Sequence, residues 1–148
     1  MKINITNKEY LILLDILYIA DWIMHGFYTE DRVATKKYRD LEQKLFSLAK
    51  EFGADDLIKP DGKDGEFFAT RKFEDESLAL EYIEEYEEES FWDELIERLA
   101  ERDLVHKYGP EIMKLIFEAE DIHDELENFK EKYAKEFEKN GLKNLRLS

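Results

Sequence analysis

The sequence predicts a mostly α fold: an irregular helical bundle of four to six helices with one small β-hairpin near residues 57–73 and a long C-terminal helix. Three observations predict it. Apolar residues recur at spacings of three and four through most of the chain. Three of the six glycines and one of the two prolines fall within residues 53–65, where the helical pattern breaks. An apolar content of 43% is ample for a packed core, and 148 residues suit a single acidic helical domain, residues 1–148.

The first helix is expected over residues 7–26. Thr6 and Glu9 fit a capping box, in which each side chain satisfies a backbone N–H at the helix start. Ile5 and Tyr10 stand where a hydrophobic staple would close the same end, and Gly26 is a natural stop.

The second helix is expected over residues 35–52, ended by Gly53. Its predicted apolar stripe has helical spacing and consists of Tyr38, Leu41, Leu45, Leu48 and Phe52. Two short apolar runs, at residues 57–59 and 67–73, then flank a cluster of Pro, Asp and Gly. That arrangement predicts the small hairpin, which needs the helices for stability.

Helix is expected to restart near Asp75 and to continue, with Ser90 as a second start signal, to about Asp103. This region forms two consecutive helices or one kinked helix. Gly109 and Pro110 then open the last helix, because proline suits the first helical position. One apolar stripe continues to Gly141, which predicts a last helix of about 30 residues, long enough to project or to pack on a second subunit.

Residues 74–101 hold thirteen acidic side chains and one base, Arg98, so they carry most of the net charge of −15. Anionic partners are repelled by such a charge, and we expect neither nucleic acid nor a membrane surface as a partner. The preferred interpretation is a solvated acidic face over core aromatics. The functional one is a face that docks a basic protein partner through Glu81, Glu84, Glu85 and Glu88, or a decoy that imitates the charge of nucleic acid.

Composition excludes several classes of chemistry. The absence of cysteine rules out disulfides, thiolate zinc sites and thiol catalysis. The longest apolar run, residues 10–24, contains two aspartates and is too short to span a bilayer, so a cytoplasmic protein is expected. No phosphate loop, dinucleotide fingerprint or nucleophile elbow occurs, and we expect no cofactor and no metal site.

A candidate ligand site lies on the mixed face of the first helix. Asp21 and His25 are one turn apart, with Tyr18 and Trp22 beside them. A carboxylate next to an imidazole is a common arrangement in general-base sites. A satisfied polar network between helices is the competing interpretation, since buried polar groups require partners. The candidate ligand-binding residues are Tyr18, Asp21, Trp22 and His25.

Two motifs bear on metal chemistry. Glu84-Glu85-x-x-Glu88 followed by Glu118-x-x-Asp121 resembles the magnesium-binding pattern of all-α nucleoside triphosphate pyrophosphohydrolases. The resemblance implies carboxylates that converge on a metal ion, yet helical geometry turns Glu84, Glu88 and Asp121 away from the apolar stripes. Glu120-x-x-His123 matches half of a di-iron signature whose second half is missing.

The sequence therefore favours a non-enzymatic protein-interaction or accessory module, with self-association through the last helix as one form of it. The alternative is a metal-dependent pyrophosphohydrolase-like enzyme acting on nucleotides.

Overall fold

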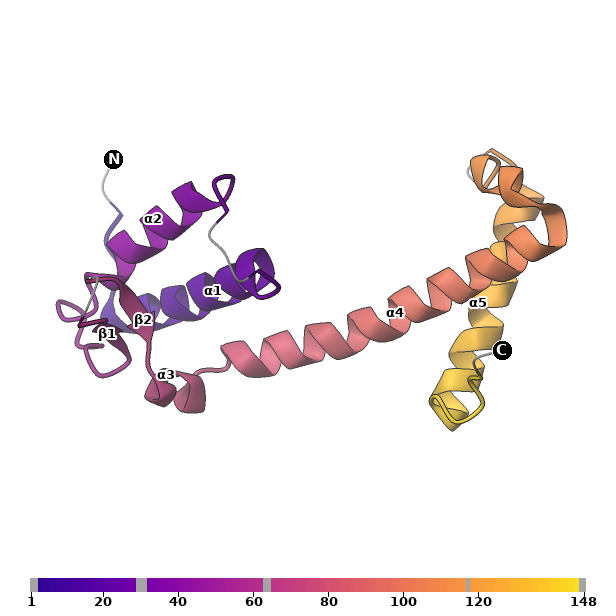
Figure 1. Cartoon of the computed structure of the whole chain (residues 1–148). Helices are drawn as coiled ribbons and strands as arrows, with labels where there is room; N and C mark the ends of the chain where they lie inside the picture. The colour runs from indigo at the N-terminus through magenta and orange to yellow at the C-terminus, as the bar shows by residue number, and fades with distance from the viewer. Residues whose placement is uncertain (1–2, 29–31, 63–64, 117, 147–148) are drawn as a thin grey trace. The chain divides into compact units, whose positions relative to one another are not determined.

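The computed structural model describes residues 3–28, 32–62, 65–116 and 118–146. Within them the chain is mostly helical, with five α-helices and a two-stranded antiparallel hairpin, which confirms the predicted fold class (Figure 1). The chain divides into two compact units, Met1–Glu85 and Tyr86–Ser148, called here the N-terminal and C-terminal units. The prediction of a single domain remains a prediction. The described elements are α1 (Asn7–His25), α2 (Lys36–Phe46), β1 (Ile58–Pro60), β2 (Phe67–Ala69), α3 (Arg71–Glu76), α4 (Ala79–Tyr108), the 3₁₀ helix η1 (Pro110–Lys114) and α5 (Glu120–Asn140).

Helix α1 begins and ends where the sequence predicts. The Thr6 hydroxyl accepts a hydrogen bond from the Glu9 N–H at 3.3 Å, and the Glu9 carboxylate accepts one from the Thr6 N–H at 2.7 Å. This confirms the capping box. At the other end, the N–H of Gly26 donates to the carbonyl of Trp22 at 2.8 Å and closes the last turn.

The core of the N-terminal unit lies between α1, the end of α2 and the hairpin. Tyr10 and Leu14 are its fully buried side chains from α1. The Tyr10 ring stacks on Phe52 at 4.3 Å, and its hydroxyl donates to the Leu45 carbonyl at 2.7 Å, so the buried phenol is not left without a partner. Burial raises the pKa of Tyr10 to about 12. The remaining buried residues of this core are Phe46, Ala49, Ala54, Ile58 and Phe73.

Helix α2 is shorter than predicted. It ends at Phe46, and the N–H groups of Leu48 and Ala49 then bond to carbonyls three residues back, as in a tightening turn. Gly53, with φ of 69°, ends these turns, because the left-handed conformation suits glycine. The predicted stripe was also wrong at its start, since Tyr38 and Leu41 are about half exposed. Glu42 and Phe46 occupy the buried positions of α2 instead.

The hairpin forms as predicted, with Lys59 opposite Phe68 in an antiparallel pair. It continues into α3, which begins at Arg71 rather than near Asp75, because the Thr70 hydroxyl accepts the Phe73 N–H at 3.4 Å and caps the helix.

Ser77, and not Ser90, separates the two helices of the acidic region. Its backbone is extended, and its hydroxyl donates to Asp15 on α1 at 2.6 Å and accepts the N–H of Ala79 at 2.9 Å. Helix α4 starts at that point and runs through Ser90 without a break. A serine favours a helix start only where its hydroxyl caps the free N–H groups of that start, as Ser77 does for Ala79.

The predicted last helix of about 30 residues is divided in two. Pro110 opens the short η1, as its missing N–H allows, and α5 begins only at Glu120. In the C-terminal unit, Ile112 from η1 and Leu126 from α5 are both buried with Ala100 and Leu104 of α4. A straight helix would carry Ile112 away from that contact, whereas the intervening turn keeps both in one core. Gly141, with φ of 55°, ends α5 as predicted.

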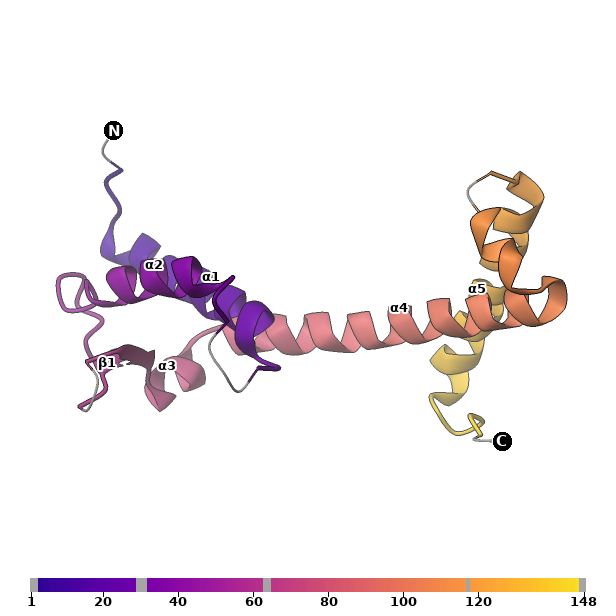
Figure 2. The same ribbon diagram turned by 45° about the horizontal axis from the view of Figure 1, so that its top comes forward.

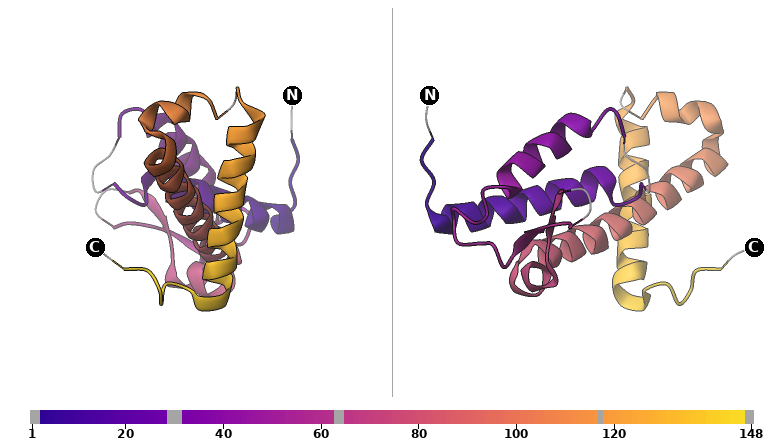
Figure 3. Two further views of the ribbon diagram at one scale, coloured as in Figure 1. Left: turned by 90° about the vertical axis from the view of Figure 1, so that its right-hand side faces the viewer. Right: turned by 60° about the vertical axis from the view of Figure 1, so that its left-hand side comes forward.

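Helix α5 packs on the C-terminal part of α4, as Figures 2 and 3 show from three directions. The Phe137 ring lies 5.5 Å from Trp92 of α4. The Tyr133 hydroxyl donates to Asp103 at 2.6 Å, and this bond helps to hold the pKa of Asp103 below its usual range against the opposing effect of burial. Lys130 pairs with Glu97 at 2.6 Å, so one of the cations of α5 neutralises part of the acidic segment.

Candidate functional site

A hollow of about 310 Å³ lies in the N-terminal unit among α1, α2 and the hairpin. Its volume falls at the lower end of the range of small-ligand pockets, roughly 300–1,000 Å³. Two of the predicted ligand residues, Tyr18 and Asp21, contribute to it from α1. The other residues that line it are Arg39, Glu42, Gln43 and Phe46 of α2, with Asp61, Glu66, Phe67, Phe68 and Ala69 of the hairpin region.

Glu42 is the most unusual residue of this hollow. Only 9% of it is exposed, and it is the one buried charged residue in the part of the chain that the structure describes. Burial, followed by the negative charge of Asp21, raises the pKa of Glu42 to about 7. The charge of Arg39 and a hydrogen bond from Gln43 act in the opposite sense. At neutral pH this carboxyl is therefore divided between its neutral and ionised forms.

Gln43 joins the hairpin to α2 and thereby forms one wall of the hollow. Its side-chain amide donates to the Phe67 carbonyl at 2.8 Å, and its side-chain oxygen accepts the Phe67 N–H at 2.7 Å. The Gln43 amide thus forms with Phe67 the same pair of hydrogen bonds that a residue of a neighbouring strand would form. Because both backbone groups of Phe67 are held, the hairpin has a fixed position over Glu42.

Asp21 and His25 form the contact that their spacing suggests. The Nδ1 atom of His25 lies 2.6 Å from the Asp21 carboxylate, and its Nε2 atom lies 2.8 Å from the Thr35 hydroxyl. A carboxylate only accepts, so Nδ1 donates. If the Thr35 hydroxyl donates its hydrogen bond to the Arg32 carbonyl, 3.2 Å away, then Nε2 of His25 must donate to the Thr35 oxygen. In that arrangement both ring nitrogens carry a proton and the ring is an imidazolium. In the neutral ring, Thr35 donates to Nε2 instead.

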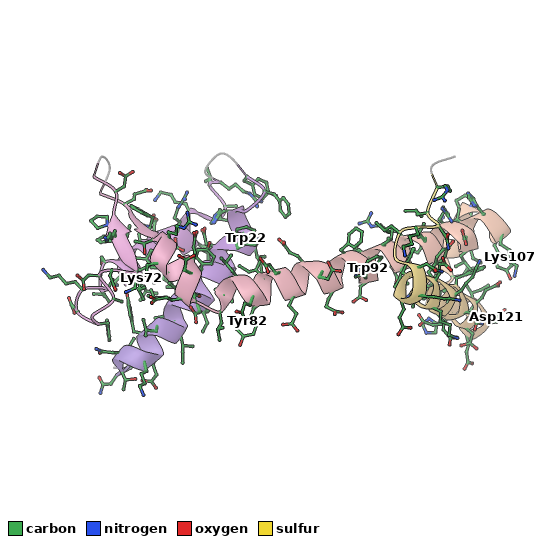
Figure 4. All side chains as sticks on the ribbon, turned by 90° about the horizontal axis from the view of Figure 1, so that it is seen from below. Trp22, Lys72, Tyr82, Trp92, Lys107 and Asp121 are labelled. Carbon is green, nitrogen blue, oxygen red and sulfur yellow. The ribbon has the colours of Figure 1, made fainter. Side chains whose placement is uncertain are left out.

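The four predicted ligand residues do not form one cluster. Tyr18 and Asp21 line the hollow, whereas His25 lines a neighbouring one of about 230 Å³ together with Arg32, Lys36 and others. Trp22 is on α1 (Figure 4) but does not line the first hollow. The Tyr18 hydroxyl donates to Glu74 at 3.1 Å, and burial, then the Glu74 carboxylate, raises the pKa of Tyr18. Whether these residues bind a ligand remains a prediction.

The predicted docking residues are all exposed on α4 (Figure 4 shows this helix with its side chains). Glu88 accepts a hydrogen bond from the indole N–H of Trp92 at 2.7 Å. In the described part of the chain, no ion pair with Lys or Arg is found for Glu81, Glu84, Glu85 or Glu88. Three apolar side chains on the same helical stretch, Leu78, Tyr82 and Tyr86, are each at least half exposed. The predicted core aromatics of this segment are thus correct only in part, because Tyr82 and Tyr86 are exposed, whereas Ile83 is buried.

Sequence reasoning missed Glu42 and Gln43. The available signal was the position of Glu42, four residues before Phe46, which puts the two side chains on one face of α2. The buried face was predicted to lie on the side of Tyr38 and Leu41, which are more hydrophobic, and nothing local shows that the hairpin covers Glu42 instead.

The described residues give no further support for a metal site or a membrane-spanning helix. Over residues 3–28, 32–62, 65–116 and 118–146, no group of three or more His, Asp or Glu side chains is placed to hold a metal ion. None of the helices described is both long and apolar enough to cross a membrane.

No match to this chain is found among protein-family models, curated proteins or solved structures. Its function is therefore inferred from its own residues.

Proposed function

We propose that this chain is a non-enzymatic protein-interaction module whose α4 binds a basic protein partner. The observation that carries the proposal is the acidic face of α4, defined as Glu81, Glu84, Glu85 and Glu88. These carboxylates are exposed and have no cationic partner in the described residues.

Repulsion among the charges of the acidic face destabilises the helix that carries them. Glu81 and Glu85 are four residues apart, as are Glu84 and Glu88, and like charges at that spacing cost roughly 0.2–0.5 kcal/mol per pair. The nearest base along the helix is Arg98, which pairs with Glu94. A cationic partner relieves this repulsion on binding, and the surrounding negative potential accelerates its encounter.

Exposed apolar side chains supply the affinity that charge alone does not. Leu78, directly before α4, and Tyr82 and Tyr86 within it follow one another at four-residue spacing, so they form a row next to the acidic face. Tyrosines are enriched at protein interfaces because a rigid ring buries much area at little entropic cost. The partner that fits is a basic amphipathic segment with apolar residues beside its cations.

Other functions have less support. The apolar stripe of α5 is already packed within the C-terminal unit, where Leu126 is buried and Phe129 and Tyr133 lie against it, so self-association through that stripe is not favoured. For a metal-dependent pyrophosphohydrolase, no observation adds to the resemblance of the motif, and the described residues contain no metal-ligand cluster.

The test is the affinity for a synthetic basic amphipathic peptide of about 20 residues, rich in Lys and Leu. Replacement of the four glutamates of the acidic face by glutamine is expected to weaken binding at least tenfold at about 0.1 M salt. Fluorescence anisotropy of a labelled peptide measures the dissociation constants.

The matched control changes the same number of charges elsewhere. Its four substitutions are at exposed acids that form no ion pair with any described residue: Glu51→Gln, Asp55→Asn, Asp124→Asn and Glu138→Gln. Binding by this variant should fall less than threefold. Equal losses in the two variants would mean that only net charge matters, and the proposal would be wrong.

A further inference from the structure

We propose that the hollow among α1, α2 and the hairpin binds a small organic ammonium ion, a ligand separate from the protein partner of α4. The proposal stands on the shape and lining of the hollow in the N-terminal unit.

The charge of the lining selects a cation. Among the residues that the structure describes, four carboxyl groups line the hollow from α1, α2 and the hairpin, against a single guanidinium, that of Arg39. An anionic ligand would meet repulsion from most of the lining. An ammonium group has three N–H donors and no acceptor, which suits a site rich in carboxylate oxygens. The four carboxyl groups belong to Asp21, Glu42, Asp61 and Glu66.

The apolar part of the lining is aromatic. Four aromatic rings border the hollow, and the negative face of an aromatic ring attracts a cation that approaches within about 6 Å. The same rings accommodate the carbon chain of an organic amine, which a bare metal ion lacks. Carboxylates and aromatic rings together therefore favour an organic ammonium ion. The rings are those of Tyr18, Phe46, Phe67 and Phe68.

The central carboxylates are held in place before any ligand arrives. Asp21 accepts from His25 at 2.6 Å, and His25 is held in turn by Thr35. Glu42 projects from α2 into a position that is nine-tenths buried, under a hairpin fixed by the two hydrogen bonds of Gln43. A site whose groups are already positioned loses little entropy on binding.

Proton binding at Glu42 couples the site to pH. Three neighbouring groups act on this carboxyl: Asp21 from α1, and Arg39 and Gln43 from α2, while Asp61 and Glu66 line the hollow from the hairpin side. With a pKa of about 7, Glu42 is mostly neutral at pH 6 and mostly ionised at pH 8. An ammonium ion stabilises the ionised form, so its binding releases a proton and strengthens as the pH rises.

The experiment is calorimetric titration of the full chain with 1,5-diaminopentane at pH 6, 7 and 8 and constant ionic strength. Both amines of this probe stay protonated over that range, so any change with pH belongs to the protein. The dissociation constant should fall about tenfold between pH 6 and pH 8, as the ionised fraction of Glu42 rises. At pH 7, buffers of different ionisation enthalpy should show release of about half a proton per ligand.

Three controls locate the site. Pentane-1,5-diol, of the same length and without charge, should not bind. Glu42→Gln should bind the diamine more weakly and with no dependence on pH, whereas Glu51→Gln, at an exposed acid, should behave as the wild type. The four-glutamine variant of α4 should also keep its affinity for the diamine, which separates this site from the peptide-binding face.

The proposal is overturned by any of three results: no saturable heat at pH 8, unchanged pH dependence in Glu42→Gln, or loss of binding in the α4 variant. The last result would mean that the diamine collects on the acidic face. Each of these outcomes leaves the test of the peptide interaction unaffected, because that test uses a different ligand and different residues.

Discussion

Glu42→Gln is expected to stabilise the N-terminal unit at pH 8 by about 3 kcal/mol. The folded protein holds the pKa of Glu42 at about 7, against 4.5 for the ordinary carboxyl, and that difference corresponds to about 3 kcal/mol. Between pH 4.5 and pH 7 the Glu42 carboxyl is protonated in the folded state and ionised in the unfolded state. The free energy of unfolding of the wild type therefore falls as the pH rises through this window. Glutamine fills the same space and does not ionise, so the variant escapes the loss.

The measurement is urea unfolding of both proteins at intervals from pH 4.5 to pH 8.5. A Trp92→Phe background leaves Trp22 as the only tryptophan, which reports on the N-terminal unit. The advantage of the variant should be near zero at pH 4.5 and reach its plateau above pH 7.5. Glu51→Gln is the matched control, and its effect should stay within about 0.5 kcal/mol. A glutamine variant that is less stable than the wild type at pH 8 would show that Glu42 is stabilised as an anion.

Leu104→Ala is expected to destabilise the C-terminal unit by about 3 kcal/mol, within the 2–5 kcal/mol typical of buried leucines. Leu104 is fully buried in α4 and packs in one core with Ile112 and Leu126. Truncation removes the Cγ and both Cδ atoms and leaves a cavity, and both effects reduce the free energy of unfolding.

Unfolding followed by Trp92 in a Trp22→Phe background measures this effect, because Trp92 packs against Phe137 in the same unit. Leu115→Ala, at a leucine that is 44% exposed, is the control and should cost less than about 1 kcal/mol. Similar losses in the two variants would contradict the assignment of the core. Leu104→Ala in the Trp92→Phe background, followed by Trp22, tests the single-domain prediction, since in one cooperative domain the Trp22 and Trp92 signals would be lost together.

Local chemistry made part of the fold predictable. The capping box at Thr6, the helical start at Pro110 and the glycine stop at residue 141 act through atoms within a few residues, so sequence alone identifies them. The hairpin was predictable for the same reason, because its turn residues interrupt a helical pattern.

The elements predicted wrongly depend on distant residues. The Ser77 hydroxyl, which lies between two helices, donates a hydrogen bond to Asp15, far away in the sequence. The division between η1 and α5 depends on packing against Ala100 and Leu104. The candidate pocket was only half predictable. Asp21 and His25 share one helix, whereas the burial of Glu42 requires the hairpin that Gln43 holds.

Hydrogen exchange along the chain, with and without the basic amphipathic peptide, tests the central claim most directly. If α4 is the docking element, the peptide should slow amide exchange over residues 78–89, and an acidic peptide of the same length should have no effect. Slower exchange confined to residues 7–25 or 120–140, with residues 78–89 unchanged, would contradict the claim.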